Sequence, residues 1–160
     1  MKLQAIAEGI KADFIKAAEL ANSPVKEADI NVEVWLKPHQ RPRLPLDMQA
    51  VYVFMHGDKC LKVGKAGPKT SARYNSQHYG SHAPSTLAKS LMARQAELGV
   101  SGLAEGGVAE WMIQELDRIS FLIPSRCGPF ALSLLEAFVQ CRLQPTFEGA
   151  LRATGSTSAP

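Results

Sequence analysis

Cysteine and long apolar stretches are both scarce in this sequence. Only three cysteines occur among 160 residues. They are widely separated, form no CxxC pair and have no histidine at zinc-finger spacing, so we expect neither a disulfide framework nor a zinc site. No apolar run is long enough to span a bilayer, and Glu8 and Asp13 interrupt the apolar positions of the N-terminal segment, unlike a signal peptide. We therefore expect a cytoplasmic protein.

A strong charge excess is also missing. The net charge of +3 permits a nucleic-acid partner without requiring one, because such binding depends on a clustered basic face. The hydrophobic fraction of 46% and the charged fraction of 21% are those of a folded globular protein rather than a disordered chain. At this length one domain with an appendage can bury a core. Composition leaves the function open.

The first 45 residues predict a helix, a strand and an extended arm. Apolar side chains recur every four residues at Ile6, Ile10, Phe14 and Ala18. This spacing predicts an amphipathic helix over residues 1–21. Residues 30–36 (INVEVWL) alternate like a half-buried strand. Residues 37–45 hold three prolines and three basic residues, which favours an extended arm over a helix.

Residues 46–152 predict a second unit that begins with a β-hairpin. Two apolar strands, 50–54 (AVYVF) and 60–63 (CLKV), flank a Gly-Asp turn, and Gly64 breaks the second strand. A short helix is expected over 71–78, a strand over 118–123 and, after Pro129, a helix over 130–143. Residues 80–115 form an insertion with helical pieces around a glycine-rich loop. The tail, residues 153–160, is expected to be disordered.

Five short motifs follow one another in this second unit. They are Ala50-Val51-Tyr52, Lys62-Val63-Gly64, Arg73 on the next predicted helix, Glu136 in the sequence LLEA, and Pro145-Thr146-Phe147. In this order they resemble the GIY-YIG nuclease family over roughly residues 48–149, because AVY stands where that family has GIY and KVG where it has YIG. The resemblance implies an α+β fold with a small, mostly antiparallel three-stranded sheet flanked by helices, here preceded by the extra helix and arm.

The resemblance also implies a reaction, the metal-dependent hydrolysis of phosphodiester bonds in double-stranded DNA. Such hydrolysis needs an activated water and a cation to absorb charge on the phosphoryl oxygens. By resemblance, Tyr52 would orient or deprotonate the water, Arg73 would clamp the phosphate and Glu136 would hold one Mg²⁺ or Mn²⁺. A guanidinium suits a phosphate because its planar fork contacts two oxygens, and a carboxylate is an oxygen ligand that Mg²⁺ prefers. Gly64 is expected to lie against the substrate.

The sequence departs from the family at several of these positions. Lys62 replaces the second tyrosine and is expected to act at the hydrolytic centre, while Lys65 resembles a lysine of the excision-repair members and is expected to contact the substrate. Glu148 stands where the family usually has asparagine. His78 is a candidate second proton carrier, one residue beyond the family position. Its ring would point elsewhere unless the helix ends before it.

Other interpretations of the same residues remain open. Tyr52 could be a core aromatic, and Lys62, Lys65 and Arg73 could form an ordinary basic surface. A carboxylate at Glu136, beside apolar neighbours, would be costly without a cation or hydrogen bonds. The rival function is a non-catalytic nucleic-acid-binding module on the same scaffold, and a weaker one is an interaction protein that docks through its first helix. The arm is either a phosphate-tracking segment or a stiff linker.

Overall fold

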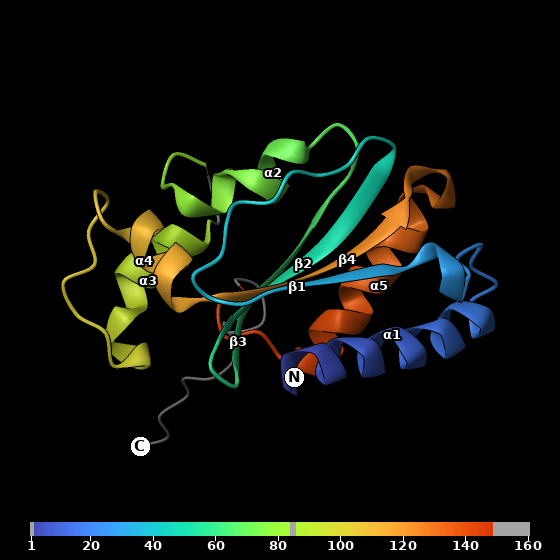
Figure 1. Ribbon diagram of the computed structural model, residues 1–160, viewed down its shortest axis with the longest axis horizontal. Coiled ribbons are helices and arrows are strands. Elements are labelled where there is room, and N and C mark those ends of the chain that lie inside the picture. Colours follow the sequence, from blue (N-terminus) through green and yellow to red (C-terminus); the bar gives the residue numbers. More distant parts are fainter. Residues whose placement is uncertain (1, 84–85, 149–160) are drawn as a thin grey trace, which may run out of the picture.

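The computed structural model describes residues 2–83 and 86–148 (Figure 1). Its strands are β1 (Asn31–Trp35), β2 (Met48–His56), β3 (Lys59–Ala66) and β4 (Asp117–Pro124). Its α-helices are α1 (Lys2–Leu20), α2 (Ser71–Asn75), α3 (Leu87–Arg94), α4 (Val108–Glu115) and α5 (Gly128–Leu143). Short 3-10 turns span Glu27–Asp29, Gln77–Tyr79, Gln95–Leu98 and Ser125–Cys127. The fold is α+β, as the sequence predicted.

The sheet has four strands in the described part of the chain, so the expectation of three was wrong. Their order is β1-β4-β2-β3, and every neighbouring pair is antiparallel. The additional strand is β1, which pairs with β4 from Asn31↔Leu122 to Trp35↔Arg118. Without β1, the backbone along the outer edge of β4 would lack hydrogen-bond partners beside a buried strand, and β1 supplies them. The N-terminal segment is therefore part of the sheet rather than an appendage.

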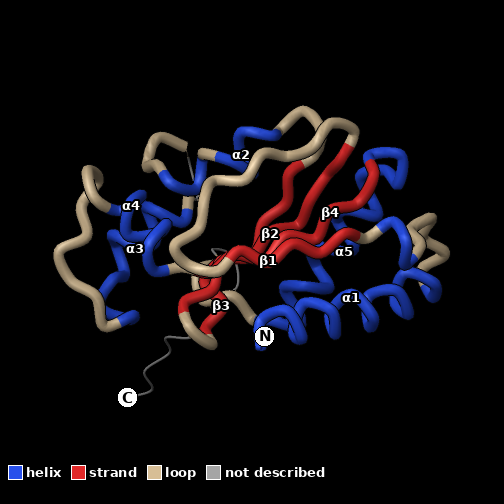
Figure 2. The backbone as a smooth tube through the Cα atoms, in the orientation of Figure 1, coloured by secondary structure: helices blue, strands red, loops and turns tan. Residues whose placement is uncertain are grey.

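Helices cover both faces of this sheet (Figures 1 and 2). Side chains alternate between the two faces along a strand, and both sets are buried in β2. Val51, Val53 and Met55 join the core formed with α1 and α5. Ala50, Tyr52 and Phe54 join a second core formed with α2, α3 and α4. The central strand therefore carries one set of side chains into each of two cores.

The arm between β1 and β2 is extended, as expected, and is anchored on the second core. His39 is buried, with its Nδ1 atom 2.7 Å from the Leu116 carbonyl oxygen and its Nε2 atom 2.6 Å from the Tyr79 hydroxyl. The Arg41 guanidinium lies 4.6 Å from the centre of the Tyr79 ring. These contacts attach the arm to the turn Gln77–Tyr79, which follows α2.

Two element boundaries differ from those expected from the sequence. The helix expected over 71–78 ends at Asn75, and β3 continues through Gly64 to Ala66, so Gly64 does not break the strand. The tail, residues 153–160, for which disorder was expected, lies outside the described residues. None of the helices in the described ranges has the length and apolar character needed to cross a bilayer.

Candidate functional site

The site begins with a tyrosine and a glycine that face each other across two strands. Tyr52 on β2 is paired in register with Gly64 on β3, and Tyr52 is 0% exposed. A Cβ atom built on Gly64 would lie 2.7 Å from the Tyr52 hydroxyl oxygen and 2.8 Å from its Cζ atom. The phenol ring thus occupies the space that a side chain at residue 64 would fill, which explains why a glycine stands inside this strand.

The Tyr52 hydroxyl lies against a buried histidine. The oxygen of Tyr52 is 2.5 Å from Nε2 of His78, which is 3% exposed. Because α2 ends at Asn75, His78 lies in the separate turn Gln77–Tyr79, and its ring points to the phenol rather than away from it. On the other side of the ring, the backbone N–H of Leu87 donates to Nδ1 at 3.3 Å. Both ring nitrogens of His78 therefore have a partner within the protein.

Burial and nearby charges shift the titration of this pair in opposite directions. Burial lowers the pKa of His78 to about 3, and the positive charges of Lys62, Arg73 and Arg118 add to the effect. Burial raises the pKa of Tyr52 to about 12, a rise that Arg73 and Arg118 oppose and that the Glu136 carboxylate reinforces. At neutral pH both side chains are uncharged. Arg73 from α2 and Glu136 from α5 therefore both act electrostatically on one phenol.

Lys65 and Glu136 form an ion pair on the other face of β3. Lys65 follows Gly64, so its side chain points to the α5 side. Its Nζ atom lies 2.8 Å from the Glu136 Oε2 atom and 3.1 Å from the Ser133 hydroxyl oxygen. Ser133 and Glu136 are three residues apart on α5 and share one side of that helix. The cation expected beside Glu136 is thus supplied by the chain itself.

Lys62 and Glu148 form a second ion pair at the same strand. Their Nζ and Oε1 atoms are 3.4 Å apart, without hydrogen-bond geometry, and Lys62 is 8% exposed. The proline-aromatic segment is joined to β3, because the N–H of Thr146 donates to the Cys60 carbonyl and that of Phe147 to the Leu61 carbonyl. This pairing places Glu148 next to Lys62. The two carboxylates, Glu136 and Glu148, therefore have separate lysine partners.

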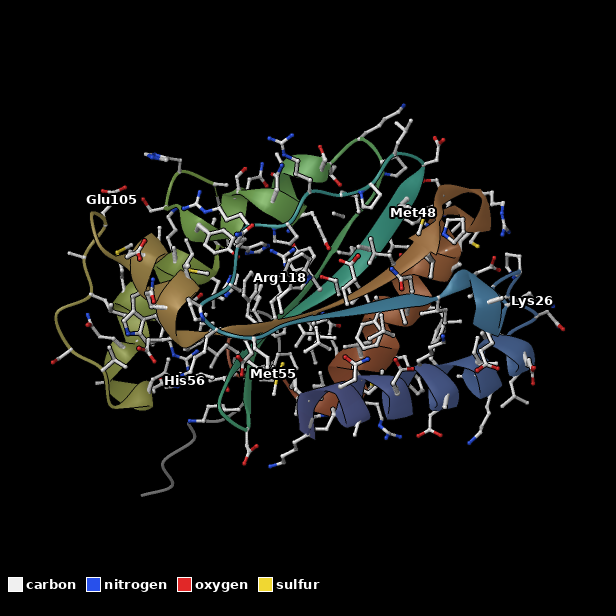
Figure 3. All side chains as sticks on the ribbon, viewed as in Figure 1. Lys26, Met48, Met55, His56, Glu105 and Arg118 are labelled. Carbon is white, nitrogen blue, oxygen red and sulfur yellow. The ribbon has the colours of Figure 1, made fainter. Side chains whose placement is uncertain are left out.

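Arg118 is a residue of this region that the sequence reasoning missed. It is 0% exposed, on β4, and Figure 3 shows it between the sheet and α2. Its guanidinium lies 4.4 Å from the Tyr74 ring centre and 5.2 Å from that of Tyr52, and it donates to the Tyr74 carbonyl oxygen at 2.6 Å. The signal in the sequence was a cation within an apolar strand, residues 118–123 (RISFLI). Arg118 therefore places a permanent positive charge close to the Tyr52 phenol.

Glu136 is the acidic side chain of this region that could take part in a metal site. Within residues 2–83 and 86–148, no group of three or more His, Cys, Asp or Glu side chains is arranged to hold an ion. Glu136 uses Oε2 for Lys65, and its side chain is 21% exposed, so Oε1 is the oxygen that remains for a cation. Mg²⁺ often takes only one or two protein oxygens and completes its shell with water and phosphate. Glu136 fits that kind of site and not a closed one.

The residues predicted from the sequence therefore lie around β3, where direct contacts or their charges link them. Tyr52 meets His78, Lys65 meets Glu136, Lys62 meets Glu148, and Arg73 lies exposed with its charge reaching Tyr52. Comparison with known proteins adds no assignment. No protein-family model matches this chain, and no curated protein or solved structure shows significant similarity to it.

Proposed function

We propose that this protein is a GIY-YIG-like endonuclease, a metal-dependent enzyme that hydrolyses phosphodiester bonds in double-stranded DNA. One observation carries the proposal. Residues from motifs far apart in the sequence act on a single buried phenol, because Tyr52 contacts His78 and feels the charges of both Arg73 and Glu136. A perturbed titratable group with several charged neighbours is a common property of catalytic sites.

Each residue then has a distinct part in the reaction. Arg73, exposed at the end of α2, binds the scissile phosphate through its planar fork. Glu136 would hold Mg²⁺ or Mn²⁺ through one oxygen, and the ion would offset charge on the phosphoryl oxygens. Tyr52 directs the attacking water by a hydrogen bond. Lys62 takes the place of the second tyrosine as a hydrogen-bonding or proton-accepting group, Lys65 adds positive charge on the other face of β3, and Gly64 leaves room for the phenol.

Substrate binding has to rearrange the ion pairs of the free protein. Lys65 occupies Glu136, and Lys62 is paired with Glu148. A divalent cation on the remaining oxygen of Glu136 would weaken the hold of this carboxylate on Lys65, whose ammonium group would then be available to a phosphate oxygen. The Tyr52 hydroxyl is closed to solvent in the free protein, so substrate binding would also have to expose it. We therefore expect metal and DNA to bind better together than separately.

The rival function is a nucleic-acid-binding module without catalysis. It is favoured by the two lysine–glutamate pairs, which already neutralise the acidic groups, and by the complete burial of Tyr52. Such a module would bind DNA in a salt-dependent way, with no need for a divalent metal. The two functions therefore differ in their response to Mg²⁺.

Plasmid nicking by the wild type and by Glu136→Gln tests the proposal. The wild type should nick supercoiled DNA only with Mg²⁺ or Mn²⁺, and Glu136→Gln should lose nicking while it keeps DNA binding, slightly strengthened by the loss of a negative charge. Glu115→Gln is the matched control, because it breaks another lysine–glutamate pair, with Lys37, on the surface. Full nicking by Glu136→Gln would sink the proposal. Metal-independent, salt-sensitive binding without nicking would favour the rival.

A further inference from the structure

The environment of His78 determines where the imidazole proton sits. Leu87 is the first residue of α3, after the N-cap Thr86, and the first N–H groups of a helix have no acceptor within the helix. The N–H of Leu87 is directed at Nδ1 of His78 instead, at 3.3 Å. A backbone N–H can only donate. Nδ1 must therefore accept, which requires that this nitrogen carries no proton.

We propose that the N-terminus of α3 holds His78 in the neutral tautomer with its proton on Nε2, so that His78 donates a hydrogen bond to the Tyr52 hydroxyl oxygen. A neutral imidazole has one N–H donor and one nitrogen acceptor, so an accepting Nδ1 leaves the proton on Nε2. Nε2 is the atom that lies 2.5 Å from the Tyr52 oxygen. The positive charges of Lys62, Arg73 and Arg118, together with burial, keep a second proton off the ring.

This hydrogen-bond direction decides what each ring can do. His78 cannot take the phenolic proton, because Nε2 already carries a proton and Nδ1 is occupied by the Leu87 N–H. It is a positioning residue for Tyr52 rather than a proton carrier. The phenol, which accepts from His78, must send its own proton to another acceptor, such as a water or a phosphate oxygen at the edge of β3. Tyr52 thus presents a hydrogen-bond donor to whatever binds there.

The proposal also gives the segment around α3 a role in the site. Residues 80–115 interrupt the resemblance to known nucleases, yet Leu87 within them supplies the contact that orients His78. Leu87 itself is 0% exposed, so its position is fixed by the second core. The hydrogen-bond direction stands on these contacts alone. Only the part assigned to Tyr52 during cleavage rests on the proposed function.

Nitrogen NMR of the free protein, labelled with ¹⁵N-histidine, tests the tautomer. His78 is identified as the signal lost in His78→Gln. Near neutral pH we expect a protonated, pyrrole-type Nε2 and an unprotonated, pyridine-type Nδ1. Tyr52→Phe should keep this pattern, because Leu87 rather than Tyr52 sets it. A proton found on Nδ1 in the wild type, or a change to that tautomer in Tyr52→Phe, would overturn the proposal.

A backbone substitution tests the cause. Replacing the Leu87 amide by an ester, through incorporation of the matching α-hydroxy acid, removes one N–H and keeps the side chain. The His78 signals should then shift toward a mixture of the two tautomers. The same ester at Ala88 is the control, since it makes the same chemical change one residue along α3, and it should leave the wild-type pattern. A pure Nε2-protonated pattern in the Leu87 ester would overturn the assignment to α3.

These outcomes are separable from the failure of the proposed function. The NMR measurement uses neither metal nor DNA, so the tautomer can be established in a protein that does not cut. A protein that nicks DNA with His78 in the opposite tautomer would disprove the inference and leave the nuclease proposal standing.

Discussion

Arg73 is exposed at the surface, and its positive charge nevertheless acts on the buried Tyr52, where it opposes the rise in pKa that burial causes. We predict that Arg73→Ala loses cleavage and keeps its fold. Removing one donor that stabilises transition-state charge typically costs about 10²–10³ in rate, whereas an exposed substitution changes the free energy of unfolding by about 0.5 kcal/mol or less. Nicking rate and thermal melting, measured on the same preparation, check this.

Lys69→Ala provides the comparison for Arg73. Lys69 is also exposed and lies just before α2, so its removal takes the same charge from the same region. We expect it to weaken DNA binding slightly and to leave the rate at saturating DNA unchanged. If Arg73→Ala and Lys69→Ala behaved alike, Arg73 would be part of a general basic surface.

Lys62 separates a proton-accepting role from a purely electrostatic one. As a base it would have to be neutral during the reaction, and arginine cannot be. We predict that Lys62→Arg melts close to the wild type, because it keeps the positive charge beside Glu148, and cleaves about 10²-fold more slowly or worse, the usual contribution of a general base. Nicking rates across pH measure this. A wild-type cleavage rate in Lys62→Arg would mean that Lys62 contributes only its positive charge and does not accept a proton.

At the residue scale, the sequence identified residues that lie near one another but not the contacts that they make. The motif order pointed to Tyr52, Arg73 and Glu136, which the structure links by charge. The lysine partners of Glu136 and Glu148 were not predictable, because they depend on how α5 and the segment after it pack against β3. The direction of the His78 ring was not predictable either, because it depends on the residue at which α2 ends. A helix end is set by tertiary contacts as well as by local sequence.

At the scale of elements, the pairing of β2 with β3 is what holds the phenol in place. We predict that Gly64→Ala lowers the free energy of unfolding by about 1–3 kcal/mol, the usual cost of overpacking a core. The added methyl would lie 2.8 Å or less from atoms of the fully buried Tyr52 side chain, so the ring or the strand would have to shift. Urea unfolding measures the change, and the His78 NMR signals should report the displaced hydroxyl.

Gly9→Ala is the matched control, with an effect of the opposite sign. Gly9 lies within α1, and a Cβ atom there would meet nothing within 4 Å. Alanine is favoured over glycine in a helix interior by about 0.5–1 kcal/mol, so this variant should be more stable than the wild type. Equal effects of the two substitutions would mean that the Tyr52–Gly64 contact is not tight.

Element boundaries show why part of the fold was missed. Residues 30–36 alternate clearly enough to predict a strand, but alternation does not say which strand is its neighbour. The pairing of β1 with β4 joins residues about eighty to ninety positions apart, as the register Asn31↔Leu122 shows, and local patterns carry no such information. The sequence predicts a strand end at Gly64 for a similar reason, since the aromatic ring that requires a glycine there comes from the opposite strand.

At the scale of the whole molecule, the two cores on either side of the sheet differ in chemistry. The α1/α5 side is assembled mostly from aliphatic side chains, together with Phe14, Phe121 and the thiols Cys60 and Cys127. The α2–α4 side encloses His39, His78 and Arg118 among aromatic rings. Burying such polar groups costs free energy unless they are hydrogen-bonded, and each of these three has hydrogen-bond partners. We call the α2–α4 side the polar core. A function that needs buried polar groups would be located there.

The polar core should make the protein sensitive to mild acid. Burial lowers the pKa of both His39 and His78, the latter to about 3, whereas the unfolded chain takes up these protons near pH 6.5, the ordinary pKa of histidine. Below that value the unfolded state binds more protons than the folded state, so the free energy of unfolding falls as pH falls. Each histidine that remains neutral in the folded state contributes a slope of about 1.4 kcal/mol per pH unit.

We predict that His78→Gln flattens this dependence by about one proton between roughly pH 6.5 and pH 5, a slope change of about 1.4 kcal/mol per unit. Carboxylates with a lowered pKa, such as Asp13 and Asp29, act in the same direction, but the unfolded chain protonates them near 3.8, below this window. Glutamine keeps an N–H donor toward Tyr52 and cannot titrate. Urea unfolding at several pH values gives the two slopes. Parallel slopes would show that His78 is protonated in the folded protein, and then its contact with Leu87 could not be a hydrogen bond.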